Sequence, residues 1–352
     1  MGIVFTFRGV GSMVGGLAVG FVLDAVHDPH TVLVVLLATK AAFECSMPFG
    51  TGVPELGMQF AVIAFCANAV STVCMTAVTW TYGKSMGPQM NILNAVFGVG
   101  ASAAPGLALV ISTFGLREVF SYEVIAVMDL VLIVAALLIP ATRNPRLKEA
   151  LGAELLEGDL RAASPSQDAG TDILAVSLCS ASVMFAGVCE AAISFWLFTY
   201  STEQLRLTRG AAGALNMFFF VAFTTTRFLC GCLVAVIGAR GVLWVSLGFA
   251  FLTSLGLVFP LGGALLPCVG MVGVGMGMAP FPANATTVLR EKTFISGRSQ
   301  GVMRILAALG SMIGASGIGF LQRWPPVGTA ALPAVIIGGL VAEAAVTVAF
   351  LR

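Results

Sequence analysis

The sequence predicts an all-α integral membrane protein, and three observations support that fold class. Hydrophobic residues make up 58% of the 352 positions and charged residues only 10%, whereas soluble domains contain about a quarter charged residues. The mean hydropathy is +0.98. Apolar runs long enough to cross a hydrocarbon layer of about 30 Å recur along the chain, without the apolar-polar alternation of β-barrel strands.

Each apolar run is expected to form one transmembrane helix. A helix needs about 20 residues to cross the hydrocarbon layer, and it satisfies its own backbone hydrogen bonds there. Eleven such runs occur, at residues 2–26, 31–49, 56–79, 91–114, 120–140, 173–199, 211–237, 241–260, 264–285, 301–321 and 331–350.

One hydrophilic segment interrupts this pattern. Residues 141–172 are rich in charged side chains and contain Ser-Pro-Ser. They are predicted to link a first membrane half, 1–140 with five spans, to a second half, 173–352 with six. Placing this linker in the cytoplasm also places most Lys and Arg residues of the other loops there, as the positive-inside rule requires. The C-terminus is then cytoplasmic as well, and we expect a multi-pass protein of the plasma membrane.

Short motifs suggest that the two halves are repeats. Ala67-Asn68-Ala69 recurs as Ala283-Asn284-Ala285 about 215 residues later, and Gly16 falls opposite Gly231 at a similar offset. The first five spans then correspond to the last five, and the sixth has no partner. We therefore expect a six-plus-six architecture in which the first helix is absent from this chain, through truncation or because the protein functions with eleven helices.

The stretch from Gly16 to Asp24, GLAVGFVLD, resembles the loop motif of the major facilitator superfamily, whose two six-helix halves enclose a substrate site near the bilayer midplane. The resemblance implies that Gly16 and Gly20 let two helices approach closely, as small residues four apart do in lipid. It also implies that Asp24 meets the other half at the cytoplasmic surface. A dinucleotide-binding fingerprint would require glycine where Val14 stands.

Two longer segments resemble the branch of this superfamily that contains fucose permeases and sodium-dependent glucose transporter-like proteins. Residues 187–200, GVCEAAISFWLFTY, are similar to its seventh helix. Residues 93–105 are similar to its fifth helix, with Asn94 in place of a usual histidine. Arg227 matches an arginine of its eighth helix. The resemblance implies secondary-active or facilitative transport of a small polar solute, with a monosaccharide favoured, by alternating access.

Glu190 is the main candidate site residue. It lies near the middle of its span, where a charge costs about 2.5–3.5 kcal/mol on insertion scales. It is expected to contact substrate or a coupling ion, or else to make a helix-packing hydrogen bond. Trp196 fits either stacking on a sugar ring or anchoring at the membrane interface.

Two amides and two arginines complete the candidate site. Asn68 and Asn284 occupy pseudo-symmetric positions, and amides both donate and accept hydrogen bonds, which suits hydroxyl-rich ligands; interhelical hydrogen bonding is the alternative. Arg227 and Arg8 fit contact with substrate oxygens or pairing with a buried acid. Further charges lie in or near spans, at Lys40, Glu44, Glu123, Asp129, Arg304 and Glu343. Lys40 and Glu44 are four residues apart and are expected to pair.

Ion coupling stays open. Coupled members of the branch carry acids in the first and fourth helices, and here the fourth-helix position falls on Asn68 or Ser71, neither of which titrates. Coupling to Na⁺ or H⁺ through Glu190 and facilitated diffusion are both compatible with the sequence.

Several function classes are not supported. No nucleophile–base pair, metal-ligand spacing or phosphate loop is recognisable, so we expect neither an enzyme, a cofactor nor a bound metal. The net charge of +1 gives no sign of nucleic-acid binding. The expected partners are a sugar-like solute and the lipid bilayer. Two alternatives are an exporter of amphipathic compounds, suggested by abundant Met and Phe, and a non-transporting receptor or scaffold on a degenerate transporter fold.

Overall fold

The computed structural model describes residues 2–26, 28–50, 52–139, 172–259, 263–321 and 328–352. Within these ranges the chain is helical and has no strand, which confirms the predicted fold class. Before the linker lie α1 (Gly2–Ala25), α2 (Pro29–Ser46), α3 (Val53–Tyr82), α4 (Gly87–Thr113) and α5 (Ser121–Leu138). After it lie α7 (Ile173–Glu203), α8 (Arg209–Val258), α9 (Leu265–Met278), α10 (Phe281–Lys292), α11 (Gly297–Leu321) and α12 (Ala331–Leu351). Short 3₁₀ turns join some of them: η1 (Met47–Phe49), η2 (Gly83–Ser85), η3 (Glu118–Phe120) and η4 (Gly328–Ala330).

The helix α8 consists of two membrane-crossing segments. At about 1.5 Å per residue, its 50 residues would form a rod more than twice the thickness of the hydrocarbon layer. Gly238 breaks it with a φ of 72°, a conformation that glycine adopts without steric cost. The chain reverses there, between the predicted spans 211–237 and 241–260.

By contrast, α9 and α10 together form one span with a break near its middle. Proline lacks a backbone N–H, so Pro280 and Pro282 cannot continue the hydrogen-bond ladder of α9. The apolar run 264–285 predicts one continuous helix, whereas the structure divides it at Ala279 and Pro280. With α8 counted twice and α9–α10 once, every predicted span coincides with a described helical segment.

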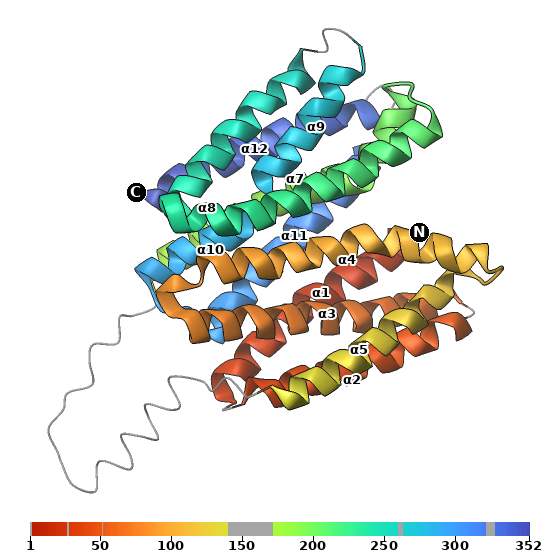
Figure 1. Cartoon of the computed structure of the whole chain (residues 1–352), viewed down its shortest axis with the longest axis vertical. Coiled ribbons are helices and arrows are strands. Elements are labelled where there is room, and N and C mark those ends of the chain that lie inside the picture. Colours follow the sequence, from red (N-terminus) through yellow and green to blue (C-terminus); the bar gives the residue numbers. More distant parts are fainter. Residues whose placement is uncertain (1, 27, 51, 140–171, 260–262, 322–327) are drawn as a thin grey trace, which may run out of the picture.

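The helices form two groups, α1–α5 and α7–α12 (Figure 1). In the first group α1 packs on α3, and α2 packs on α3 and α5; in the second group α7 packs on both α11 and α12. The groups meet through α1 against α11 and α4 against α8. These two contacts are equivalent under the predicted repeat, which pairs α1 with the first part of α8 and α4 with α11. Residues 141–171 of the predicted linker lie outside the described residues.

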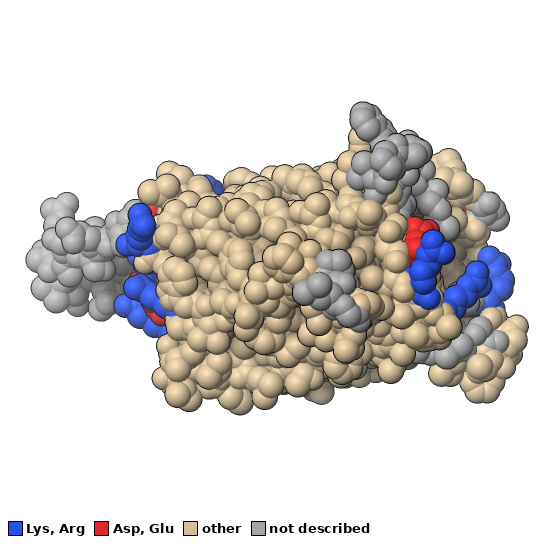
Figure 2. Space-filling model, turned by 90° about the horizontal axis from the view of Figure 1, so that it is seen from above, with Lys and Arg blue, Asp and Glu red and all other residues tan. Residues whose placement is uncertain are grey.

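The exterior fits a lipid environment. Nine helices of the described chain are long and apolar enough to cross a membrane, as judged by length and composition. Lys, Arg, Asp and Glu residues gather at the two ends of the face shown in Figure 2, with a broad band of other residues between them. We call the end at which α5 finishes and α7 begins the linker end. The largest buried apolar cluster lies in the second group, around α7.

Candidate substrate-transport site

Arg227 connects the two helix groups through several contacts of its side chain. It lies on the first part of α8 and is only 2% exposed. Its Nε donates a hydrogen bond to the carbonyl oxygen of Ala279 at 3.0 Å, and one terminal nitrogen donates to the carbonyl oxygen of Asn94, also at 3.0 Å. Its second terminal nitrogen lies 3.4 Å from Oε2 of Glu190. One guanidinium therefore links α8, α7 and the α9–α10 junction to α4 of the other group.

The surroundings of Arg227 follow from local sequence. The break between α9 and α10 places the carbonyl of Ala279 where it accepts from the guanidinium instead of continuing a helical ladder. Phe223 lies one turn before Arg227, and its ring centroid is 4.2 Å from the guanidinium carbon, a cation–π distance. These contacts hold the planar guanidinium in one orientation.

Glu190 is the accessible member of this ion pair. Its side chain is 29% exposed, compared with 3% for that of Arg227. A carboxylate has more acceptor capacity than one hydrogen bond uses. Glu190 can therefore accept hydrogen bonds from a solute while Arg227 compensates its charge. Both residues are candidates predicted from the sequence, and the structure brings them together.

A pair of amides forms a second link between the groups. Asn91 of α4 donates through Nδ2 to Oδ1 of Asn284 on α10 at 3.2 Å, and both side chains are fully buried. Asn91 is not among the candidates predicted from the sequence, although an amide at the start of a predicted apolar span is a usable signal. Asn284 also donates to the carbonyl of Pro280 at 2.8 Å, so its amide is engaged in packing in this conformation.

The other predicted site residues lie apart from this centre or contact it only through the backbone. Asn68 of α3 donates to the carbonyl of Ser12 on α1 at 2.7 Å. The side chain of Asn94 donates to Met90 of its own helix, and only its carbonyl meets Arg227. Trp196 donates through Nε1 to the carbonyl of Ala315 on α11 at 2.8 Å. The side chains of Asn68 and Trp196 thus make contacts between helices, whereas that of Asn94 bonds within its own helix.

Arg304 is a further cation that the structure places near this centre. It lies on α11, contacts Met75 of α3, and interacts electrostatically with both Arg227 and Glu190. From the sequence, Arg304 is one of several charges within predicted spans, and nothing marks it as part of the site. Its proximity to Glu190 depends on the packing of α11 on α7, which no local pattern indicated.

Glycines let α1 and α11 meet near the linker end. A Cβ added at Gly20 would lie 2.5 Å from the carbonyl oxygen of Gly297, and one added at Gly16 would lie 2.9 Å from Cβ of Arg304. Beyond them, Asp24 accepts hydrogen bonds from the backbone N–H groups of Gly297 and Arg298, at 2.7 and 3.1 Å. The N-terminus of α11 carries a partial positive charge, so this carboxylate stabilises the contact.

A comparison with known protein families identifies this architecture. The family model for the Major Facilitator Superfamily matches residues 1–315. The chain belongs to the major facilitator superfamily. The resemblance drawn from the sequence motifs is thereby confirmed.

Relatives within the superfamily include two curated proteins named sodium-dependent glucose transporter 1. The one from Danio rerio is 24% identical over 369 residues, which cover 92% of this chain and 59% of the relative. The one from Xenopus laevis is 24% identical over 348 residues, which cover 92% of this chain and 69% of the relative. The chain thus spans about three fifths of the length of the Danio rerio protein.

The solved structure of the Escherichia coli fucose:proton symporter shares the fold. It superposes with a TM-score of 0.73 at 15% sequence identity, covering 99% of this chain and 89% of the symporter. At this level of identity, the similarity establishes the superfamily fold alone.

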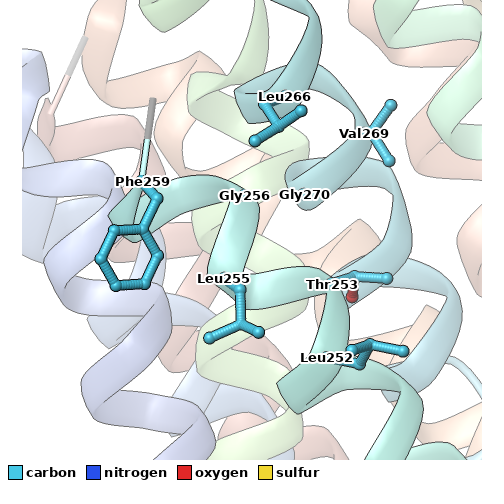
Figure 3. Close-up of a pocket in the computed structure, with 8 residues that line it drawn as sticks. All are labelled: Leu252, Thr253, Leu255, Gly256, Phe259, Leu266, Val269 and Gly270. Atoms are coloured by element: carbon cyan, nitrogen blue, oxygen red, sulfur yellow. The ribbon is translucent and has the colours of Figure 1, made fainter. Parts of the chain in front are cut away.

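One surface pocket of this superfamily member lies away from Arg227. It has a volume of about 420 Å³ and is lined by the second part of α8 and by α9, mainly through Leu252, Leu255, Phe259, Leu266 and Val269 (Figure 3). Several of these side chains are well exposed on the outer surface, so an acyl chain of the bilayer would fit it. Among the described residues, no group of three or more His, Cys, Asp or Glu could hold a metal ion.

Asp24 offers a first test of the α1–α11 contact. Replacing it with asparagine is expected to weaken this contact by about 1 kcal/mol, since a carboxylate at a helix N-terminus contributes about that much. Opening at the linker end should then become about fivefold more populated. Electron paramagnetic resonance would measure this population from the distances between spin labels at positions 25 and 240 in a cysteine-free background.

The matched control for this test is Asp28→Asn. Asp28 caps α2 by accepting from the N–H of His30, and asparagine is an equally good cap. The distance distribution of Asp28→Asn should match that of the parent protein. A distribution left unchanged by Asp24→Asn would show that this carboxylate does not stabilise the contact of α1 with α11.

Proposed function

We propose that this protein transports a monosaccharide across the membrane by alternating access between its two helix groups. The observation that carries the proposal is the Glu190–Arg227 pair, in which an accessible carboxylate lies beside a buried guanidinium where the two groups meet. The names of the two glucose-transporter relatives and of the fucose:proton symporter support a sugar as the substrate. Because the chain spans only 59% of the Danio rerio relative, we propose both the transport activity and the sugar substrate of this chain.

The geometry supports recognition of hydroxyl groups. Each sugar hydroxyl donates one hydrogen bond and accepts others. A site with an acceptor, Glu190, beside a donor, Arg227, can satisfy both capacities of the hydroxyl group. Glu190 would accept from the sugar and Arg227 would donate to it. At 3.4 Å, the contact between their side chains is the longest of the three hydrogen bonds of Arg227. It is therefore the contact most easily exchanged for a substrate oxygen, while the two carbonyl contacts keep Arg227 in place.

Alternating access would use the linker-end contact as a gate. Asp24 and the glycines of α1 hold that end together through α11, so the substrate would enter from the opposite end before this contact separates. We propose that the linker end faces the cytoplasm of a cell with this protein in its plasma membrane. The linker end carries Lys84, Arg240, Arg290, Lys292 and Arg298, as the positive-inside rule predicts.

Uptake of radiolabelled hexoses into proteoliposomes tests this function, with Glu190→Gln as the decisive variant. Glutamine preserves size but removes the charge, and hydrogen bonds to charged groups contribute about 1.5–3 kcal/mol. Uptake should fall about 10- to 100-fold. The control is Glu203→Gln at the end of the same helix, where the carboxylate accepts a hydrogen bond from Thr329 at 3.0 Å; its uptake should match wild type.

Two outcomes would count against the proposal. Full uptake by Glu190→Gln would remove Glu190 from the site. Wild-type vesicles that take up no hexose would favour an exporter of amphipathic compounds or a non-transporting receptor instead.

A further inference from the structure

A second charged cluster lies between α2 and α5, away from the Arg227 centre. Nζ of Lys40 lies 2.7 Å from Oε1 of Glu44 and 2.7 Å from Oδ2 of Asp129. Both acids are buried, with Glu44 2% exposed and Asp129 5% exposed. The sequence predicted the pair on α2, and the fold adds the second acid from α5.

The cluster contains more negative than positive charge. Two carboxylates share one ammonium, so its formal charge is −1 when all three groups are ionised. Uncompensated charge within a membrane-spanning region is strongly unfavourable. One carboxylate oxygen, Oε2 of Glu44, is also buried without a hydrogen-bond partner among the described residues. A single proton on this oxygen would make the cluster neutral.

The neighbouring titratable groups do not supply the missing positive charge. Cys66 of α3 and Tyr122 of α5 interact electrostatically with the cluster, but thiols and phenols are neutral or negative, never positive. Arg8 of α1 is positive, but its side chain is exposed and acts on Tyr122; the charges that act most strongly on Glu44 are those of Lys40 and Asp129. The short turn η1, which also packs on α2, contains no titratable residue.

A proton fits this cluster better than a metal cation. Metal cations such as Ca²⁺ and Mg²⁺ require six or more oxygen ligands in proteins. Here the ammonium of Lys40 already contacts both carboxylates and would repel a second cation. A proton needs only the one unpartnered oxygen.

We propose that this cluster binds one proton reversibly at Oε2 of Glu44, and that this proton is the coupling ion of the transporter. On binding, a proton from water forms an O–H bond with Oε2 and the formal charge changes from −1 to 0; on release the proton returns to water. The coupling role rests on the proposed transport function. A pocket of about 380 Å³, lined by Ser46, Glu55 and Gln59 among others, opens at the end of α2 that carries Glu44 and would admit water.

The fold connects the cluster to the contact between α1 and α11 at the linker end. The helix α3 packs against α2 on one side and against α1 on another, and α1 packs against α11 of the second group. A change in the charge of the cluster can therefore shift α3, and through α3 it can alter the contact of α1 with α11.

Infrared spectroscopy of the purified full chain tests proton binding without any substrate. The wild type should show a protonated-carboxyl band that decreases as pH rises, and Glu44→Gln should lack that pH-dependent component. Asp129→Asn should lack it too, because the remaining Lys40–Glu44 pair is already neutral. Glu123→Gln, on the same helix six residues before Asp129, is the control and should retain it. A component unchanged in both Glu44→Gln and Asp129→Asn would overturn the proposal.

A proteoliposome experiment tests the coupling role. With an inward gradient of one pH unit, one proton per sugar allows up to about tenfold accumulation. Glu44→Gln should equilibrate hexose without accumulating it, and should still exchange internal for external hexose. Accumulation by Glu44→Gln equal to that of wild type would overturn coupling. If wild-type vesicles take up no hexose, the transport function and the coupling role both fail, while the infrared result still decides whether Glu44 binds a proton.

Discussion

Replacing Arg227 with methionine is expected to destabilise the folded protein by about 3–5 kcal/mol, the usual cost of removing one partner of a buried ion pair. The carbonyl oxygens of Asn94 and Ala279 would lose their donor, and Glu190 would keep an uncompensated charge at membrane depth. Sugar uptake should be abolished, because the link between α8 and α4 at this depth is lost. Arg227→Lys should fall between wild type and methionine, since an ammonium keeps the charge but cannot present the planar fork of donors.

Denaturant-induced unfolding in detergent, together with vesicle uptake, would measure both effects of Arg227→Met. Arg209→Met provides the control. It lies at the beginning of the same helix and its side chain is exposed, so it should change stability by less than about 0.5 kcal/mol. Equal stability of Arg227→Met and Arg209→Met would show that the guanidinium contacts contribute nothing to the fold.

Replacing Gly20 with valine is expected to force α1 and α11 apart. Its Cβ would lie 2.5 Å from the carbonyl oxygen of Gly297 and 3.1 Å from Cα of Gly301, and both neighbours are backbone atoms that cannot rotate away. Overpacking of this kind costs about 1–3 kcal/mol. Because the cost falls on the closed linker end, opening there should become about 5- to 150-fold more populated.

The distances between spin labels at positions 25 and 240 would detect this shift. Hexose uptake would show whether the protein still transports when its linker end cannot close. Gly213→Val on α8 is the matched control, since a Cβ at Gly213 has no neighbour within 4 Å. Gly213→Val should leave the distances unchanged. If Gly20→Val also left them unchanged, the close approach of α1 and α11 would not control opening.

Much of the fold was predictable because it depends on local properties of the chain. Hydropathy located each span, since crossing a hydrocarbon layer requires a contiguous apolar helix. The turn at Gly238 fell between two predicted spans. The break of α9 and α10 at Pro280 was not anticipated, although Pro280 and Pro282 were visible, because prolines are tolerated inside transmembrane helices whose neighbours satisfy the freed backbone groups.

The candidate site was predictable only in part. Glu190 and Arg227 stood out because ionisable side chains within a span are costly unless they are paired or functional. The groups that bind to them across the fold could not be recognised in the sequence. The carbonyl of Asn94 is 133 residues from Arg227, and Asn91 is 193 residues from Asn284. Amides and carbonyls so far apart carry no local sign of their pairing.

The sequence alone predicts that this protein is a bundle of apolar helices, approximately where each membrane span lies, and which charges within the spans need compensation. The tertiary structure decided which groups provide that compensation. It placed Asp129 beside Lys40 across 89 residues, Arg227 between two helix groups, and Asp24 at the start of α11. The physical reason is that desolvation acts on each residue as soon as it enters the membrane, whereas hydrogen bonds and ion pairs have a range of a few ångströms and form only when packing brings their partners together.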